Sequence, residues 1–273
     1  MKISIIGLGY VGLIQAAGMA KLGHDVIGID IDKEKVENVN KKIPPIYEKG
    51  LKELLNEIVP KKLIATTEFN KTILDTDITF ICVGTPSKKQ GEMSLHQLEN
   101  VLRQLGEILK KKKFHLFVIK STVVPGTCEK VVIKTLEEAS GKKYMQDFSV
   151  VMNPEFLREG EAIEDFFEPD RIVLGSTDKK ALATIKKAYS TFTCPILLTE
   201  FKEAEMIKYA SNAFLATKIS FINEVGNVSK KNGIDTNVVA KGIGLDKRIS
   251  PSFLRSGIGF GGSCFPKDVS ALV

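Results

Sequence analysis

The chain has 273 residues, of which 43% are hydrophobic and 26% are charged, so it is long enough to bury one large core or two smaller ones. A net charge of +6 with only five arginines, no tryptophan and five tyrosines gives little support for a nucleic-acid partner. No apolar run approaches the roughly 18 residues that cross a bilayer, so we expect a cytoplasmic protein with no nucleic-acid or membrane partner.

Short apolar strands alternate with amphipathic helices over the first 200 residues. Strands are predicted at residues 2–6, 25–30, 63–66, 78–83, 114–119 and 148–152, and helices up to about residue 22 and at residues 94–111 and 127–139. This alternation predicts an α/β fold, in which helices cover both faces of a doubly wound, Rossmann-like parallel sheet. We expect residues 1–200 to form this domain.

The pattern changes near residue 200. Residues 203–231 contain no proline and one glycine and carry apolar residues at steps of three and four, which predicts one long helix. Such a helix would span on the order of 40 Å, more than a small domain needs for its own packing, so we assign part of it to a subunit interface. A short helix at about 235–243 and a glycine-rich loop at 256–268 follow. Residues 201–273 are therefore expected to form a central helical domain that also serves dimerisation.

Three glycines follow the first strand in the pattern Gly7-x-Gly9-x-x-Gly12, and Asp30 closes the second strand. In this context Gly7 permits a tight turn, Gly9 lets a pyrophosphate approach the backbone, and Gly12 allows a helix to pack closely on the strand. Asp30 can accept hydrogen bonds from a ribose diol, which favours NAD over NADP. The alternative is a glycine turn of an α/β fold that binds no dinucleotide.

Polar residues follow the later strands, at the edge of the sheet where α/β folds bind ligands. Thr85 and Thr122 come after two strands, and Glu155 and Glu159 lie in a turn-like segment after a third. Helix capping is the alternative interpretation for the threonines, and a solvated loop is the alternative for the carboxylates.

An ammonium and an amide share one face of the predicted long helix. Lys208 and Asn212 are four residues apart, and Glu205 is nearly aligned with them one turn earlier. Such a group is typical of a functional face, although a surface pair is the simpler interpretation when these residues are considered alone.

Cys264 lies in the glycine-rich loop, where glycines permit close approach of a ligand and Lys267 is near enough to activate the thiol. A nucleophile fits this position better than a packing residue, whereas Cys82 is expected to be buried and inert in its strand. The four cysteines and three histidines are scattered along the chain, so neither a disulfide framework nor a metal site is indicated.

Five motifs together resemble the UDP-glucose/GDP-mannose dehydrogenase family. They are GLGYVGL at residues 7–13, VGTP at 83–86, STVVPGT at 121–127, NPEFLREG at 153–160 and GFGGSCFPKD at 259–268. The resemblance covers the entire chain, and PDRIVLG at 169–175 with Phe253 and Leu254 is most similar to the UDP-glucose 6-dehydrogenase branch.

The resemblance implies a four-electron oxidation of the C6 hydroxyl of a nucleotide sugar, UDP-glucose to UDP-glucuronate, by two NAD⁺ in succession. Cys264 would trap the aldehyde as a thiohemiacetal and then carry a thioester. The implied catalytic residues are Cys264, Lys208, Asn212, Asp268, Thr122, Glu155 and Glu159, and which of the last four acts as the base stays open. The implied cofactor contacts are Gly7, Gly9, Tyr10, Val11, Gly12, Asp30, Lys35, Thr85, Thr122 and Glu155. The implied substrate contacts are Phe156, Leu157, Lys208, Asn212, Phe253 and Gly261.

The sequence also departs from the pattern of the family, whose members continue for more than a hundred residues past the cysteine into a domain that binds the sugar nucleotide. We therefore expect a fragment that binds NAD, turns over weakly or not at all, and forms a homodimer through the central helix. The alternatives are the same chemistry on GDP-mannose or a UDP-N-acetylhexosamine, and a non-catalytic NAD-binding or dimerisation module.

Overall fold

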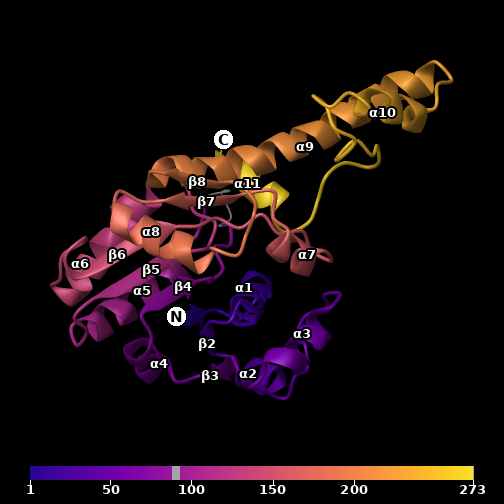
Figure 1. Cartoon of the computed structure of the whole chain (residues 1–273). Coiled ribbons are helices and arrows are strands. Elements are labelled where there is room, and N and C mark those ends of the chain that lie inside the picture. The colour runs from indigo at the N-terminus through magenta and orange to yellow at the C-terminus, as the bar shows by residue number, and fades with distance from the viewer. Residues whose placement is uncertain (88–92, 273) are drawn as a thin grey trace. The chain divides into compact units, whose positions relative to one another are not determined.

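The computed structural model describes residues 1–87 and 93–272 (Figure 1). Within these residues the strands form one eight-stranded sheet in the order β3-β2-β1-β4-β5-β6-β7-β8. The strands are β1 (Lys2–Ile6), β2 (Asp25–Ile29), β3 (Leu63–Thr66), β4 (Ile78–Ile81), β5 (His115–Ile119), β6 (Phe148–Met152), β7 (Ile172–Gly175) and β8 (Ile196–Thr199).

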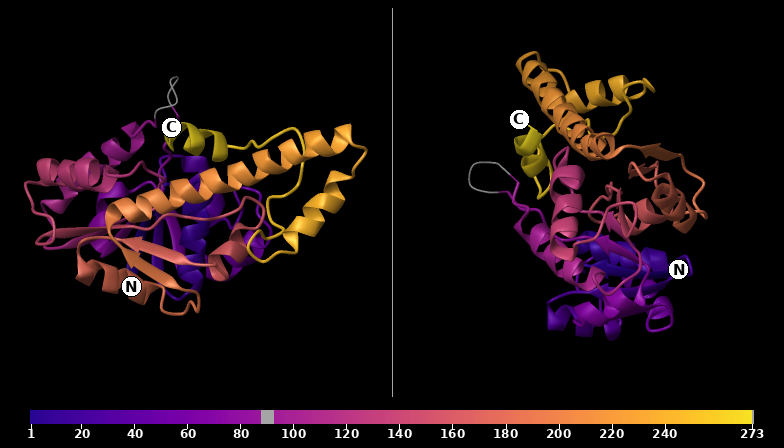
Figure 2. Two further views of the ribbon diagram at one scale, coloured as in Figure 1. Left: turned by 90° about the horizontal axis from the view of Figure 1, so that it is seen from above. Right: turned by 90° about the vertical axis from the view of Figure 1, so that its left-hand side faces the viewer.

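Helices follow most of the strands. They are α1 (Tyr10–Lys21), α2 (Lys33–Asn40), α3 (Leu51–Ile58), α4 (Phe69–Asp75), α5 (His96–Leu109), the π-helix η1 (Cys128–Ile133), α6 (Lys134–Ser140), α7 (Ala162–Phe167), α8 (Lys179–Ala188), α9 (Phe201–Lys231), α10 (Thr236–Gly244) and α11 (Phe265–Leu272). The long orange helix in Figure 2 is α9.

The first six strands are parallel and have the Rossmann order 3-2-1-4-5-6. Strands β4, β5 and β6 are buried along their whole length, because their apolar side chains on both faces are covered. Strand β7 joins β6 in the antiparallel direction, and β8 is parallel to β7. The predicted doubly wound, mostly parallel α/β fold followed by one long helix is therefore confirmed.

Two compact units divide the chain. Unit 1 contains residues 1–85 and 94–206, and unit 2 contains residues 86–93 and 207–273. In unit 1, α1 packs against α3 and α7, and α5 packs against α6. No helix in the described part of the chain combines the length and apolar character that a membrane span requires.

Two segments differ from the expected elements. Residues 127–139 were expected to form one regular helix, but the first part is the π-helix η1, and α6 continues it. Residues 265–268 were expected to belong to the glycine-rich loop, but they begin α11. Proline is compatible with the first turn of a helix, so Pro266 does not prevent this helix from starting directly after Cys264.

Candidate functional site

The turn after β1 has the geometry of a dinucleotide cradle. Gly7 has φ +88°, and a Cβ there would lie 2.9 Å from the Cys82 carbonyl oxygen. A Cβ on Gly12 would lie 1.7 Å from the Gly7 oxygen, so this position also excludes a side chain. Apart from Gly9 itself and its two chain neighbours, no atom of the described residues lies within 4 Å of a Cβ built on Gly9, which leaves the start of α1 open to a ligand. The site therefore fits a pyrophosphate held by backbone N–H groups, with Tyr10 and Val11 as the first residues of α1.

Asp30 follows β2 and is held by three donors. Its Oδ2 accepts hydrogen bonds from the Leu8 backbone N–H at 2.7 Å and from Lys35 Nζ at 3.0 Å, and its Oδ1 accepts from the Asp32 N–H at 3.0 Å. Burial by itself raises the pKa of Asp30, but the hydrogen bonds from Asp32, Lys35 and Leu8 lower it below the ordinary value. The carboxylate is thus ionised and fixed at the position expected for a ribose partner.

Thr85 and Thr122 lie in contact at the carboxyl edge of the sheet. The Thr85 hydroxyl donates to the Thr122 carbonyl oxygen at 2.8 Å, and Ser121 Oγ donates to the Val83 carbonyl oxygen at 2.7 Å. These bonds join the loop after β4 to the loop after β5. The sequence predicted only that Thr85 and Thr122 lie at the same edge of the sheet, and the structure shows that they are in contact.

Residues 153–161, which we call the carboxylate loop, contain four of the predicted site residues. Glu155 is buried, and its Oε2 accepts the Leu157 backbone N–H at 2.8 Å. The Arg171 guanidinium lies 4.0 Å from the centre of the Phe156 ring, a cation-π contact. Glu159 is exposed. Contacts of its side chains therefore order the first half of the carboxylate loop, whereas residues 158–161 are exposed.

A buried polar network that the sequence did not predict lies beneath this edge. Asn153 Oδ1 accepts hydrogen bonds from Lys120 Nζ at 3.1 Å and from the Tyr189 hydroxyl at 2.8 Å, and Asn153 Nδ2 donates to the Val173 carbonyl oxygen. Gln15 Nε2 donates to the same tyrosine oxygen at 2.9 Å. Asn153 begins the NPEFLREG motif and Lys120 directly precedes the STVVPGT motif, whereas nothing local marks Gln15 or Tyr189.

Unit 2 contains a second cluster, on α9 and α11. Asn212 Nδ2 donates to Asp268 Oδ2 at 2.7 Å, and Lys267 Nζ donates to Asp268 Oδ1 at 2.5 Å. Asn212, Asp268 and Lys208 are all buried. The cluster thus joins two segments that are 56 residues apart. The Lys267 ammonium, which the sequence had suggested as an activator of the thiol, donates to Asp268 in this cluster.

Cys264 immediately precedes α11, and its carbonyl oxygen accepts the Asp268 backbone N–H at 2.9 Å. It is exposed, whereas burial raises the pKa of the Cys82 thiol to about 12 and also raises the pKa values of Cys128 and Cys194. The other three thiols are therefore protonated at neutral pH, and Cys264 is the accessible candidate for a nucleophile.

Two predicted substrate residues lie on the chain that leads to Cys264. Phe253 has φ +62°, and its ring centroid lies 6.1 Å from that of Phe265, the first residue of α11. Gly261 is exposed, and no described atom comes within 4 Å of a Cβ built on it. Gly261 therefore leaves its backbone open beside the cysteine.

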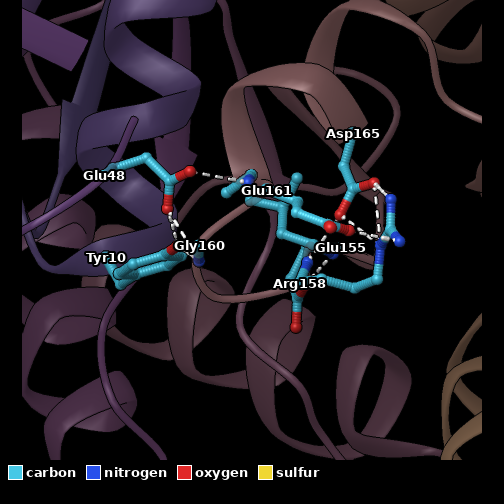
Figure 3. Close-up of polar contacts among 9 residues, drawn as sticks. Tyr10, Glu48, Glu155, Arg158, Gly160, Glu161 and Asp165 are labelled. Atoms are coloured by element: carbon cyan, nitrogen blue, oxygen red, sulfur yellow. Dashed lines mark hydrogen bonds and ion pairs between the residues drawn. The ribbon is translucent and has the colours of Figure 1, made fainter. Parts of the chain in front are cut away.

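Glu205 lies on α9 with Lys208 and Asn212 and is buried like them. It is fully buried in unit 1, where it accepts the backbone N–H groups of Gly126 and Cys128. Glu48 was missed altogether. It lies between α2 and α3 and accepts hydrogen bonds from Tyr10, Gly160 and Ala162 (Figure 3).

The sheet order, the glycine turn and the ionised Asp30 together define a Rossmann-like dinucleotide-binding protein. The comparison with family models is more specific. The chain belongs to the UDP-glucose/GDP-mannose dehydrogenase family, whose NAD binding domain matches residues 1–193 and whose central domain matches residues 202–273. The resemblance inferred from the motifs is confirmed, and NAD is the cofactor of the matched domain.

Known relatives are nearly half identical to this chain over the aligned region. The UDP-glucose 6-dehydrogenase AglM of Haloferax volcanii is 47% identical over all of this chain and 65% of its own length. A GDP-mannose 6-dehydrogenase of Pseudomonas syringae pv. tomato is 46% identical over all of this chain and 63% of its own length. The solved structure of a UDP-glucose dehydrogenase from Pyrobaculum islandicum has a TM-score of 0.94 and 47% identity over 99% of this chain and 62% of the other. The chain thus spans less than two thirds of the length of these relatives.

Proposed function

We propose that this protein oxidises the C6 hydroxyl of a nucleotide sugar to a carboxylate, with UDP-glucose converted to UDP-glucuronate. In this proposal residues 1–200 bind NAD and residues 201–273 form the central domain. The observation that carries it is the combination, within unit 2, of an exposed Cys264 with buried Lys208, Asn212 and Asp268. A thiol captures an aldehyde readily and is also a good leaving group in thioester hydrolysis, so it suits a two-step oxidation.

The proposed reaction begins when a base removes the C6 hydroxyl proton and a hydride leaves C6. NAD⁺, when bound, accepts one hydride in each oxidation. The Cys264 thiolate adds to the aldehyde carbon, and the thiohemiacetal loses a hydride and a proton to become a thioester. Water cleaves the thioester, which releases the carboxylate and the thiol. Lys208 and Asn212 supply a cation and an amide that stabilise the developing alkoxide.

The other predicted residues divide between cofactor, water and sugar nucleotide. We assign Thr122, Glu155, Glu159 and Asp268 to holding or activating water. The cofactor contacts in the proposal are Gly7, Gly9, Tyr10, Val11, Gly12, Asp30, Lys35 and Thr85, and the remaining substrate contacts are Phe156, Leu157, Phe253 and Gly261. The open backbone at Gly9 and the fixed carboxylate of Asp30 support the cofactor assignment.

GDP-mannose is the second candidate substrate, because a GDP-mannose 6-dehydrogenase is 46% identical to this chain and a UDP-glucose 6-dehydrogenase is 47% identical. Absorbance at 340 nm, which reports NADH, separates the two when each sugar nucleotide is supplied in turn. In a full-length parent that contains this chain, UDP-glucose is expected to give two NADH per sugar, whereas residues 1–273 alone are expected to turn over weakly or not at all. A faster reaction with GDP-mannose would overturn the substrate assignment while leaving the chemistry intact.

Replacement of the cysteine tests the chemistry directly. In Cys264→Ser we expect carboxylate formation to be lost while the Kd for NAD⁺, measured by calorimetry, stays within about twofold of the unsubstituted value. The matched control is Cys194→Ser, which removes a thiol whose pKa is raised by burial and should leave both readouts unchanged. Incubation with NAD⁺ and the 6-aldehyde of the sugar nucleotide should give a covalent adduct on the Cys264 peptide in the mass spectrum. NAD binding without any adduct would instead favour a non-catalytic module.

A homodimer through the central helix is part of the proposal. Phe214, Phe221 and Val228 are exposed on α9 at steps of seven residues, so they form one apolar stripe along the helix. Such a stripe is typical of a helix whose face is covered by a second helix.

A further inference from the structure

A buried carboxylate lies among the residues of unit 1 to which no role has been given. Glu48 stands in the segment between α2 and α3, and it is 6% exposed. Its Oε2 accepts the Gly160 backbone N–H at 3.0 Å and its Oε1 accepts the Ala162 N–H at 3.0 Å. The Tyr10 hydroxyl donates to Oε2 as well, and its oxygen accepts the Gly160 N–H at 2.9 Å. In Figure 3, dashed lines join the Glu48 carboxylate to Tyr10 and Gly160, which lie side by side, and to the chain beside Glu161.

The three groups that Glu48 holds come from two separate parts of the sequence. Tyr10 is the first residue of α1, directly after the open glycine of the dinucleotide turn. Gly160 belongs to the carboxylate loop, and Ala162 begins α7. One carboxylate therefore connects the cofactor turn to the loop that carries Glu155 and Glu159.

A second carboxylate fixes the same end of the carboxylate loop. Asp165 accepts the Arg158 backbone N–H at 2.7 Å, and it also accepts the Arg158 guanidinium, with Nη2 at 2.6 Å. Together with the bond from Leu157 to Glu155, these contacts hold the loop through side-chain acceptors, since the loop lies outside any helix or strand. Its conformation therefore depends on a few carboxylates, and Glu48 connects it to the cofactor turn through Tyr10.

We propose that Glu48 is a positioning residue, which fixes the carboxylate loop against Tyr10 and so sets where Glu155 and Glu159 lie relative to bound NAD. The inference rests on the proposed function, because it assigns Glu48 to the cofactor and water site of that function. The chemistry of the contacts is specific to a carboxylate. Tyr10 and the two backbone groups are all donors toward Glu48, and an ionised carboxylate is a side chain with acceptor atoms only.

A glutamine at this position would have the same size as Glu48, but it would carry a hydrogen-bond donor group where the glutamate has only acceptors. Its oxygen could serve one or two of the donors, and its NH₂ group would face the remaining backbone N–H. A buried donor without an acceptor is unfavourable, so the loop is expected to move away from α1. Burial, and then the hydrogen bond to Glu48, raise the pKa of Tyr10, so this hydroxyl remains a donor at neutral pH.

Hydrogen exchange at single amides tests the local contacts. In Glu48→Gln the Gly160 and Ala162 amides are expected to exchange at least about tenfold faster, while the interior amides of α5 change less than twofold. Glu48→Asp keeps the charge but is one methylene shorter, so an intermediate effect is expected. The matched control is Glu57→Gln on α3, where the carboxylate pairs with Lys21 on the exposed surface. Unchanged exchange at Gly160 and Ala162, or equally faster exchange at all amides, would overturn the positioning role.

NAD affinity tests the consequence for the cofactor turn. We expect Glu48→Gln to raise the Kd for NADH about tenfold, and the double variant with Tyr10→Phe to raise it by no more than about twofold further, because both substitutions break the same contact. NADH fluorescence is a clean readout, since the chain has no tryptophan. If the unsubstituted chain failed to bind NADH, the proposed function would be wrong, and hydrogen exchange would still decide the role of Glu48. If it bound NADH and Glu48→Gln bound equally well, the inference alone would fail.

Discussion

Asp30 is a carboxylate that the fold keeps ionised. Burial opposes ionisation, but the donors Leu8, Asp32 and Lys35 outweigh it and lower the pKa below the ordinary value of 3.8. Because the folded-state pKa is depressed, the stabilisation from the ionised group is fully present above the unfolded-state value and is lost as the pH falls through the folded-state value. Hydrogen bonding to a ribose diol should therefore not depend on pH in the neutral to mildly acidic range.

The corresponding prediction concerns NAD affinity and pH. Between pH 7 and pH 5 the Kd for NAD⁺ is expected to change less than about twofold, because Asp30 stays ionised throughout. Asp30→Asn should raise the Kd about tenfold or more, since an amide replaces a charged acceptor. Calorimetry at the two pH values checks both statements, with Glu37→Gln on the exposed surface of α2 as the control. A tenfold loss of affinity at pH 5 in the unsubstituted chain would contradict the assignment.

A site residue could be predicted when its role depends on its neighbours in the sequence, and not when it depends on a partner far away in the chain. Gly7, Gly9 and Gly12 are recognisable because their roles depend on the backbone between one strand and the next helix. Glu48 has no such signal, since its partner Gly160 is 112 residues away and only the folded chain brings them together. Lys267 shows the limit of a local signal: its closeness to Cys264 in sequence suggested that it activates the thiol, and its bond to Asp268 was not foreseen.

At the scale of elements, the strands and helices that were predicted have a clear local sequence pattern, and those that were missed do not. Strands β1 to β6 and helix α9 were predicted because their apolar patterns are continuous and bounded by glycine or polar residues. Strands β7 and β8 were not predicted, and the Leu197 and Leu198 side chains of β8 are exposed, so this edge strand lacks the buried apolar run of the central strands. Helix α11 starts three residues after Gly262 in a glycine-rich segment, so its first turn looked like part of the loop.

Glu205 links α9 to the segment that carries Thr122. From the first turns of α9 it accepts the N–H of Gly126 and, at 2.8 Å, that of Cys128 at the start of η1. Burial raises the pKa of Glu205, although the backbone donors act against this. A carboxylic acid whose folded-state pKa is raised contributes stability that is present at low pH and is lost as the pH rises through the folded-state value.

Two outcomes follow for variants of Glu205. Glu205→Ala should lower the free energy of unfolding by about 2 kcal/mol, because two buried backbone donors lose their acceptor. The stability advantage of the unsubstituted chain over Glu205→Gln should grow as the pH falls from 7 to 5, because protonation of Glu205 is favoured in the folded state. Urea unfolding at both pH values measures this, and Glu203→Gln, on the exposed side of the same turn, is the control. An advantage that shrinks toward pH 5 would contradict the prediction.

For the whole molecule, the exposed side of α9 determines the expected assembly. Phe214 is 64% exposed, Phe221 56% and Val228 62%, and their seven-residue spacing puts them on one side of the helix. Large apolar side chains in a continuous row on a soluble protein are typical of an interface with another chain. A second copy is the expected partner, because two such stripes complement each other across a two-fold axis.

Phe221→Glu tests this assembly, since it puts a charge in the centre of the stripe on both copies. Each buried phenylalanine contributes about 2 kcal/mol, and a twofold interface loses two of them, so the dimer dissociation constant should rise by about a hundredfold or more. Sedimentation velocity over a dilution series should show a dimer for the unsubstituted chain and a monomer for the variant. Phe221→Leu, which keeps the stripe apolar, should remain dimeric. If NAD affinity stays the same in the Phe221→Glu monomer, the loss belongs to the interface alone, whereas a dimer that persists in this variant would place the subunit contact on another surface.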